Sequence, residues 1–313
     1  MIAKQMGMFL KLGADYARER SNSETTVACP LCLAEYNRAN ITELTREHIV
    51  PSKLGGRTQT LTCRKCNNTQ GSDLDSHLIN LVKSLDAIEG TEPIKTSVSS
   101  GKGKITAELL LGAGTQDEPI SIQIVGPASD MRAVQDLRNT WREDSTLELK
   151  MNFSVIPERY IRASLRAAFL SVFKVEGYKY ALSPGAEQVR NTLGSGTPVL
   201  KNVLMEAFPE CDPGTDLLVM PADFKDFGEY YAVLLRLKTK RTRYISVLLP
   251  GKRGGDWSTL EALYQHAPRL RLETTPDGWD SKLCIRFGEN PLAKLQRGLH
   301  DRFMQAISSK PQK

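Results

Sequence analysis

The chain has 313 residues, of which 40% are apolar and 25% are charged, and its formal net charge is +6. This composition is close to that of ordinary globular proteins, so it excludes wholesale disorder and allows one or two folded domains. The net charge tolerates a polyanionic partner without establishing one. No apolar run approaches the roughly 18 residues that a membrane-spanning helix needs, and the N-terminus lacks a secretion signal. A soluble cytoplasmic protein without a membrane partner is expected.

The chain opens with a helical pattern at residues 3–20, within an N-terminal segment 1–26, and then enters a cysteine-rich segment at residues 27–88. Four cysteines of this segment form two Cys-x-x-Cys pairs, Cys29 with Cys32 and Cys63 with Cys66. Two such pairs bring four thiolates together, which suits a closed tetrahedral zinc site with a structural role. The remaining cysteines, Cys211 and Cys284, belong to no motif.

A two-stranded hairpin is expected between the cysteine pairs, with strands near residues 41–49 and 59–62 and Gly55-Gly56 in the connection. A helix follows the second pair, because leucines recur there at helical spacing: Leu74, Leu78, Leu81 and Leu85. Two strands and a helix around zinc make a domain too small to hold together on its own core.

Three polar residues of this segment have the chemistry that metal-assisted hydrolysis requires. Imidazole exchanges a proton near neutral pH, so His48 is a candidate general base. Glu47 offers a hard oxygen ligand that suits Mg²⁺ or Mn²⁺, and Asn67, directly after Cys66, offers an amide oxygen. Adjacent strand residues point to opposite faces, so Glu47 and His48 serve one site only if the strand ends or bends there, which Pro51 favours.

The segment resembles the HNH, or ββα-metal, endonucleases over residues 27–88. The resemblance lies in Glu47-His48-Ile-Val-Pro51, in Gly55-Gly56 and in Cys63-Arg-Lys-Cys66-Asn67. It implies that His48 is the general base, that Glu47 and Asn67 bind a catalytic Mg²⁺ or Mn²⁺, and that the four cysteines bind structural zinc. It also implies a metal-dependent endonuclease that hydrolyses phosphodiester bonds in DNA, of a kind often found among restriction and anti-phage enzymes.

One departure from the family concerns the residue that orients the base. The asparagine that usually precedes the second cysteine pair is missing, and the chain reads Arg57-Thr58-Gln59-Thr60 there. Thr58, Gln59 or a backbone carbonyl is left as the partner of His48. Asn68 and Asp75 are further candidates for metal or substrate contact, although such residues are more often found at helix starts or on the surface.

An α+β fold is expected, with the small zinc-stabilised ββα-metal module at 27–88, a linker at 89–103 and a larger α+β domain at 104–313. The larger domain would recognise DNA, sense a signal or mediate oligomerisation. Its expected strands lie at 104–111, 120–125, 146–155, 217–220, 230–238, 244–249, 270–274 and 283–287, and its expected helices at 131–142, 157–176 and 293–307.

Two groups of basic residues follow the module. Arg159, Arg162 and Arg166 share one face of the helix expected at 157–176, either as a solvated face or as a ridge that contacts phosphates. A denser group surrounds the tip of the last hairpin, with tyrosines interleaved, and its predicted nucleic-acid contacts are Lys240, Arg241 and Arg243.

Two alternatives to a DNA endonuclease stay open at this point. The first is a non-catalytic zinc module that binds nucleic acid or protein, in which Glu47 and His48 are structural. The second is a nuclease that acts on RNA. Because a single ββα site cuts one strand, cleavage of both DNA strands would need a homodimer or sequential nicking.

Overall fold

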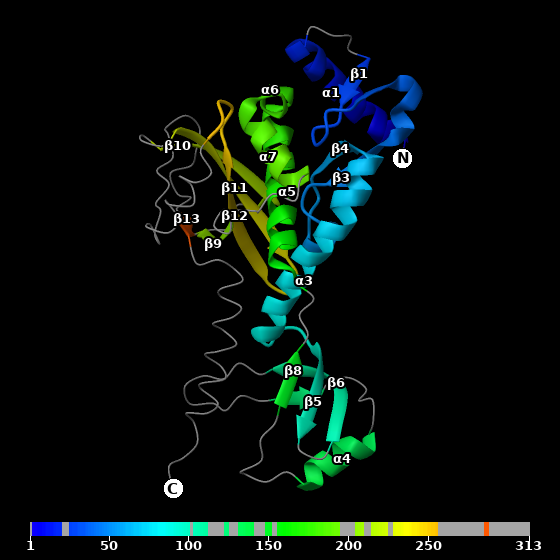
Figure 1. Cartoon of the computed structure of the whole chain (residues 1–313), viewed down its shortest axis with the longest axis vertical. Helices are drawn as coiled ribbons and strands as arrows, with labels where there is room; N and C mark the ends of the chain where they lie inside the picture. The colour runs from blue at the N-terminus through cyan, green and yellow to red at the C-terminus, as the bar shows by residue number, and fades with distance from the viewer. Residues whose placement is uncertain are drawn as a thin grey trace. The chain divides into compact units, whose positions relative to one another are not determined.

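The structure of the chain is a computed structural model. It describes residues 2–20, 25–100, 103–111, 122–124, 131–140, 148–151, 155–194, 204–209, 214–224, 228–255 and 285–287. These residues form helices and antiparallel strands, which confirms the expected α+β class (Figure 1). The chain divides into two compact units, Met1–Ile79 with Val155–Pro291 and Asn80–Ser154 with Leu292–Lys313. No helix among the described residues is long and apolar enough to cross a bilayer.

The first unit begins with α1 (Ile2–Arg20) and two small antiparallel hairpins. The first hairpin pairs β1 (Thr26–Ala28) with β2 (Glu35–Asn37), and the short helix η1 (Arg38–Glu43) leads to the second. The second hairpin pairs β3 (Leu44–His48) with β4 (Gln59–Cys63) and confirms the strand pair expected inside the cysteine-rich segment.

The connection between β3 and β4 contains η2 (Ser52–Leu54) and the two glycines. Gly55 has a φ of 81°, a conformation that side chains disfavour. A Cβ atom on Gly56 would lie only 1.8 Å from the carbonyl oxygen of Val50. Both glycines are therefore required by the path of the backbone, which returns β4 against β3.

One helical run follows β4 and consists of α2 (Arg64–Cys66), η3 (Asn67–Gly71) and α3 (Ser72–Ile88). The four leucines expected on its inner stripe are all buried. Within this run, η3 is a turn of π-helix, a widening that is often found at functional sites.

The long helix α5 (Pro157–Glu176) has the bounds that its sequence predicts. Pro157 occupies the first turn, and Gly177, with a φ of 64°, ends the helix. Its apolar face is buried and includes Phe169 and Phe173. Two further helices follow, α6 (Tyr178–Ala181) and α7 (Pro184–Gly194).

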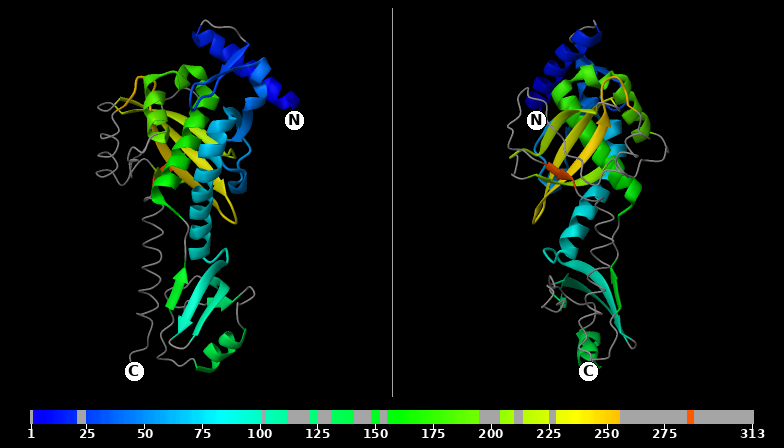
Figure 2. Two further views of the ribbon diagram at one scale, coloured as in Figure 1. Left: turned by 45° about the vertical axis from the view of Figure 1, so that its right-hand side comes forward. Right: turned by 90° about the vertical axis from the view of Figure 1, so that its left-hand side faces the viewer.

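Helix α5 packs on one face of a five-stranded antiparallel sheet (Figure 2). The strand order is β10-β11-β12-β9-β13. The strands are β9 (Leu204–Pro209), β10 (Leu217–Phe224), β11 (Gly228–Lys238), β12 (Thr242–Pro250) and β13 (Ile285–Phe287). An aromatic contact links α6 to the sheet, because the ring of Tyr180 packs edge-on against the ring of Tyr231 on β11, with 5.3 Å between ring centroids. The core of this unit is thus closed by residues far apart in the sequence.

The second unit contains a four-stranded antiparallel sheet of order β7-β6-β5-β8, the end of α3 from Asn80 onward and the helix α4 (Met131–Thr140). Its strands are β5 (Ile94–Ser100), β6 (Gly103–Leu111), β7 (Ile122–Ile124) and β8 (Glu148–Met151). The strands expected at 104–111, 120–125 and 146–155 correspond to β6, β7 and β8.

These units differ from the division expected from the sequence. The expected linker at 89–103 contains β5, a strand with the polar sequence Ile-Lys-Thr-Ser-Val-Ser-Ser that lacks a strand's apolar alternation. Residues 155–291 join the N-terminal segment instead of forming one domain with residues 104–154. Long-range packing decides this division, and local sequence patterns do not report it. The strand expected at 270–274 and the helix expected at 293–307 lie outside the described residues.

Candidate active site

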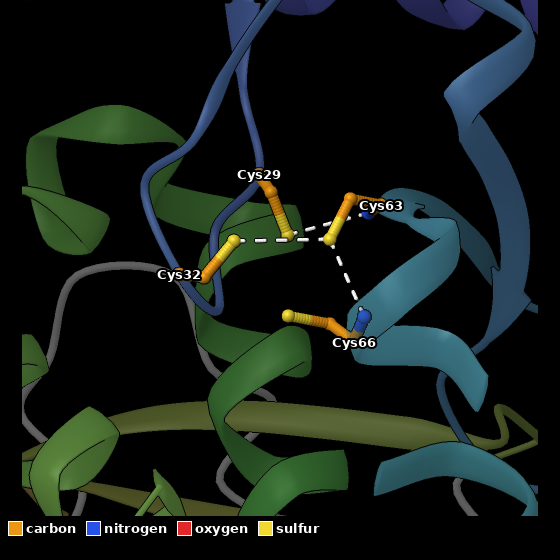
Figure 3. A group of neighbouring side chains, drawn as sticks. All are labelled: Cys29, Cys32, Cys63 and Cys66. Carbon is orange, nitrogen blue, oxygen red and sulfur yellow. Dashed lines mark hydrogen bonds between the residues drawn. The ribbon is translucent and has the colours of Figure 1, made fainter. Parts of the chain in front are cut away.

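The two Cys-x-x-Cys pairs meet in space, as their spacing predicts (Figure 3). Their four sulfur atoms all lie within 4.8 Å of one another. The backbone amide of Cys63 donates to Sγ of Cys29, and that of Cys66 donates to Sγ of Cys63, both at 3.3 Å. Such amide donors stabilise thiolates, so the backbone is arranged for charged sulfur ligands.

The dimensions of this cluster fit zinc. A tetrahedral zinc with Zn–S bonds of about 2.3 Å separates its sulfur ligands by about 3.8 Å, and Sγ of Cys32 lies 3.7 Å from Sγ of Cys63. The contact with Cys32 raises the pKa of Cys29, and the same contact lowers the pKa of Cys32. Four sulfurs this close cannot all ionise without a cation among them, so the donor set calls for a metal.

Helix η3 begins one residue after the second pair, and it directs Asn67 toward β3. The side-chain amide of Asn67 donates to Oγ1 of Thr45 at 2.9 Å. Thr45 and Glu47 lie two residues apart on β3 and so share one face of the strand. The hydrogen bond with Thr45 fixes the orientation of the Asn67 amide and leaves its oxygen, Oδ1, for another partner.

Gly71 marks the place where the oxygens of Glu47 and Asn67 converge. A Cβ atom on Gly71 would lie 2.7 Å from Oδ1 of Asn67 and 3.4 Å from Oε1 of Glu47. The two oxygens therefore face a common space that any larger residue at this position would fill. A carboxylate and an amide oxygen are hard ligands, so the donor set and the space fit Mg²⁺ or Mn²⁺.

Arg166 of α5 enters the same cluster, which the sequence did not predict. Its guanidinium Nη2 lies 2.9 Å from Oε1 of Glu47, and its Nη1 lies 3.7 Å from Oδ1 of Asp75. Burial raises the pKa of Asp75 to about 7, while Arg166 acts to lower it and Glu47 to raise it. The other candidate on this helical run, Asn68, is exposed at the surface.

The arginine face expected on α5 is therefore not one surface. Arg166 is buried, whereas Arg162 is mostly buried and Arg159 is half-exposed, and each of these two pairs with an exposed carboxylate. Arg159 pairs with Asp73 at 2.7 Å, and Arg162 pairs with Glu158 at 3.0 Å. Neither a solvated face nor a ridge of three phosphate contacts describes this arrangement. No signal from sequence neighbours separates Arg166 from Arg162, because both arginines are flanked by buried apolar residues.

His48 is the last residue of β3, so the strand ends where a shared site with Glu47 requires it to end. Its Nε2 lies 2.7 Å from the side-chain amide of Gln59, which is its register partner on β4. Of the three partners considered from the sequence, Gln59 is the one that makes this contact. Among the described residues no contact joins the imidazole to Glu47 or Asn67, and only the chain itself holds His48 beside Glu47.

The hairpin of β3 and β4 is attached to the rest of the first unit at the strand that carries Gln59. Lys174 of α5 donates to the backbone oxygen of Gln59 at 3.2 Å. The carboxylate of Asp216 accepts from the backbone amides of Arg57 and Thr58, at 2.7 and 2.8 Å, and from the hydroxyl of Thr58 at 2.6 Å. The start of β4 is thereby fixed by residues far along the chain.

The predicted nucleic-acid residues lie in two different environments. Lys240 and Arg241 are exposed in the turn between β11 and β12, whereas Arg243 on β12 is only 8% exposed. Two of the interleaved tyrosines, Tyr230 and Tyr231, are buried. The exposed basic group at this hairpin tip is therefore smaller than the sequence pattern suggests.

Comparison with known families agrees with the geometry of the N-terminal segment. Residues 29–83 match the family model described as HNH endonuclease. No curated protein and no solved structure matches the chain. The match contains both cysteine pairs, Glu47, His48 and Asn67, but not Arg166. Its extent, together with the four converging cysteines, identifies residues 29–83 as an HNH endonuclease module of the type with two zinc knuckles.

Proposed function

We propose that the chain is a metal-dependent endonuclease that hydrolyses phosphodiester bonds in DNA. The observation that supports it best is that oxygens of Glu47 and Asn67 both lie near Gly71, inside an HNH module in which His48 directly follows Glu47. A module that only binds nucleic acid or protein has no need of a space shaped by two hard oxygen ligands. The four cysteines support this arrangement by holding η3 against β3.

The proposed reaction uses His48 as the base that takes a proton from water. In the structure the amide nitrogen of Gln59 faces Nε2 and donates to it. In the proposed active tautomer the Gln59 amide turns over, so that its oxygen accepts the ring proton on Nε2 and Nδ1 is left free to act as the base. The water oxygen then bonds to phosphorus as the bond to the 3′ oxygen breaks, which gives 5′-phosphate and 3′-hydroxyl ends. A divalent cation bound by Glu47 and Asn67 would supply positive charge for the phosphate and for the leaving oxygen.

Substrate contact outside the module is proposed for the hairpin tip. Lys240 and Arg241 are exposed and basic, as phosphate contacts must be. Arg243 is proposed to support Lys240 and Arg241 from a buried position beside them and not to expose a large surface to phosphate. Cleavage of both DNA strands would use a homodimer or two nicking events, and a role in restriction or antiviral defence follows from the family resemblance.

The test is cleavage of supercoiled plasmid by the wild type, His48→Ala and His77→Ala, each with Mg²⁺, Mn²⁺ or EDTA. His77 is a matched control because its imidazole accepts a hydrogen bond from the amide of Ile156, away from the cluster. Nicking that needs the cation and His48, but not His77, is expected. Full activity of a folded His48→Ala protein would refute the assignment. Cleavage of RNA instead of DNA would support the alternative substrate.

A further inference from the structure

Arg166 lies outside the segment that matches the family model, and its side chain is the least exposed of the charged side chains in the site. Its side chain is 1% exposed, and its two ion-pair partners, Glu47 and Asp75, belong to β3 and α3. Nη2 also lies 3.3 Å from the place that a Cβ on Gly71 would take. The guanidinium thus borders the space that Glu47 and Asn67 enclose.

This guanidinium is poorly satisfied by hydrogen bonds. Within the described part of the chain, Nε and Nη2 of Arg166 have no hydrogen-bond partner, although Nη2 is close enough to Glu47 for an ion pair. Buried guanidinium donors usually have partners, because leaving them unpaired is costly. Charge therefore holds Arg166 in place more than hydrogen-bond geometry does, and one positive charge faces two carboxylates.

We propose that Arg166 is a positioning residue of the cation site that supplies the counter-charge of Glu47 and Asp75 and thereby keeps divalent-cation binding weak until a nucleic-acid phosphate adds negative charge. The inference rests on the proposed function of the same site. A buried carboxylate needs a nearby cation, and Arg166 meets that need when no metal is bound. The same positive charge repels an incoming Mg²⁺ or Mn²⁺.

Removing the guanidinium has two linked consequences. The variant Arg166→Met leaves the carboxylate of Glu47 buried without a counter-charge and removes the cation beside the partly exposed Asp75, so the metal-free protein loses stability. A divalent cation relieves this strain in the variant more than in the wild type, so it must bind the variant more tightly. The metal-free variant is therefore less stable than the metal-free wild type, while its affinity for the divalent cation is higher.

The experiment measures Mn²⁺ binding by electron paramagnetic resonance and thermal unfolding with and without Mn²⁺, both in the absence of DNA. The proteins are the wild type, Arg166→Met, Arg166→Lys and Arg159→Met, all checked for zinc content. Arg159 is the matched control, because it sits on the same helix and pairs with the exposed Asp73. Arg166→Met is expected to bind Mn²⁺ about tenfold more tightly or better, and Mn²⁺ is expected to raise its unfolding temperature more than that of the wild type.

The lysine variant keeps the positive charge, so its Mn²⁺ affinity and that of Arg159→Met are expected to stay near the wild-type value. Equal or weaker Mn²⁺ binding by a folded, zinc-loaded Arg166→Met protein would overturn the inference, as would tightening in Arg166→Lys. If Arg166→Met does not fold even with Mn²⁺, the Mn²⁺ affinity of Arg166→Lys alone decides.

Cleavage by the wild type in the same preparations separates this inference from the proposed nuclease function. An active wild type with unchanged Arg166→Met affinity defeats only this inference, whereas an inactive wild type that binds no Mn²⁺ defeats both.

Discussion

The guanidinium of Arg166 ion-pairs with the carboxylate of Glu47 at 2.9 Å, and this contact joins the HNH module to the long helix α5. Glu47 lies in the segment that matches the family, whereas Arg166 lies well beyond its end. The proposed cation site is therefore built from two parts of the chain. Lys174 and Asp216 attach the same end of this hairpin from the β4 side, near Gln59. The module owes its local geometry to residues that its motif does not contain.

The first prediction concerns the space at Gly71 that the oxygens of Glu47 and Asn67 face. Gly71→Ala places a Cβ 2.7 Å from Oδ1 of Asn67, so Asn67 must move and cleavage should fall by about 10- to 100-fold. The half-saturating Mg²⁺ concentration should rise in the same titration. Gly7→Ala in α1 is the control, since its Cβ would meet nothing within 4 Å, and it should gain roughly 0.5–1 kcal/mol of stability without loss of activity. A half-saturating Mg²⁺ concentration in Gly71→Ala equal to that of the wild type would show that the space at Gly71 holds no cation.

The second prediction concerns the partner of His48. Gln59→Leu removes the amide that contacts Nε2 at 2.7 Å, and the cleavage rate at saturating DNA should fall about 10- to 100-fold while the DNA KM stays constant. Gln59→Glu should restore much of the rate, because a carboxylate oxygen also accepts a proton from Nε2. Equal activity of the leucine and glutamate variants would mean that Gln59 does not orient the base.

The third prediction uses the pH dependence of Asp216. Burial alone would raise the pKa of this carboxyl, but hydrogen bonds from Thr58 and Arg57 outweigh burial and lower it below its ordinary value of 3.8. A depressed pKa stabilises the fold above the unfolded-state pKa, and this stabilisation disappears as the pH falls through the folded-state pKa. Asp216→Asn should therefore cost about 1 kcal/mol at pH 7, a modest value because the carboxyl is half-exposed.

Guanidinium unfolding of the wild type and Asp216→Asn at several pH values measures this difference. The gap in free energy of unfolding should be constant above neutral pH and should close below the ordinary pKa of 3.8. Asp73→Asn, which changes an exposed carboxylate, serves as the control. If the difference in the free energy of unfolding persists in acid, the loss of stability in Asp216→Asn comes from altered packing and not from the carboxylate charge.

The fourth prediction concerns zinc. Cys63→Ser removes one of four sulfurs that lie within 4.8 Å of one another, so bound zinc, thermal stability and cleavage should be lost together. Adding Mg²⁺ should not restore cleavage, because Asn67 depends on the knuckle for its position. Cys211→Ser, outside both pairs, should retain zinc and activity. Full cleavage by zinc-free Cys63→Ser protein would contradict a positional role for the knuckles.

The local elements could be predicted from the sequence because each has its own signal. Pro157 and Gly177 mark the ends of α5, and the leucine stripe marks α3. The cysteine spacing predicted the sulfur cluster. In contrast, the polar sequence of β5 predicts a linker, and the grouping of residues 155–291 with the N-terminal segment depends on long-range packing.

Arg166 illustrates the same limit within the site. Its spacing from Arg159 and Arg162 suggested a common face, since sequence period reports helix geometry and not what packs against it. Only the arrival of β3 and α3 beside α5 turns this arginine into a partner of Glu47 and Asp75. Residues that complete a site from a distant element carry no local motif.

Glu47 and Asn67 are proposed to bind the cation that the nuclease uses, and a measurement of Mn²⁺ binding examines this role without relying on cleavage. Electron paramagnetic resonance would follow Mn²⁺ binding in the presence of duplex DNA. All proteins would carry His48→Ala to keep the DNA intact, alone or combined with Glu47→Gln, Asn67→Ala or the control Asp73→Asn. We expect one DNA-dependent Mn²⁺ site that survives Asp73→Asn and is lost with Glu47→Gln or Asn67→Ala. Mn²⁺ binding that is unaffected by both changes would contradict it.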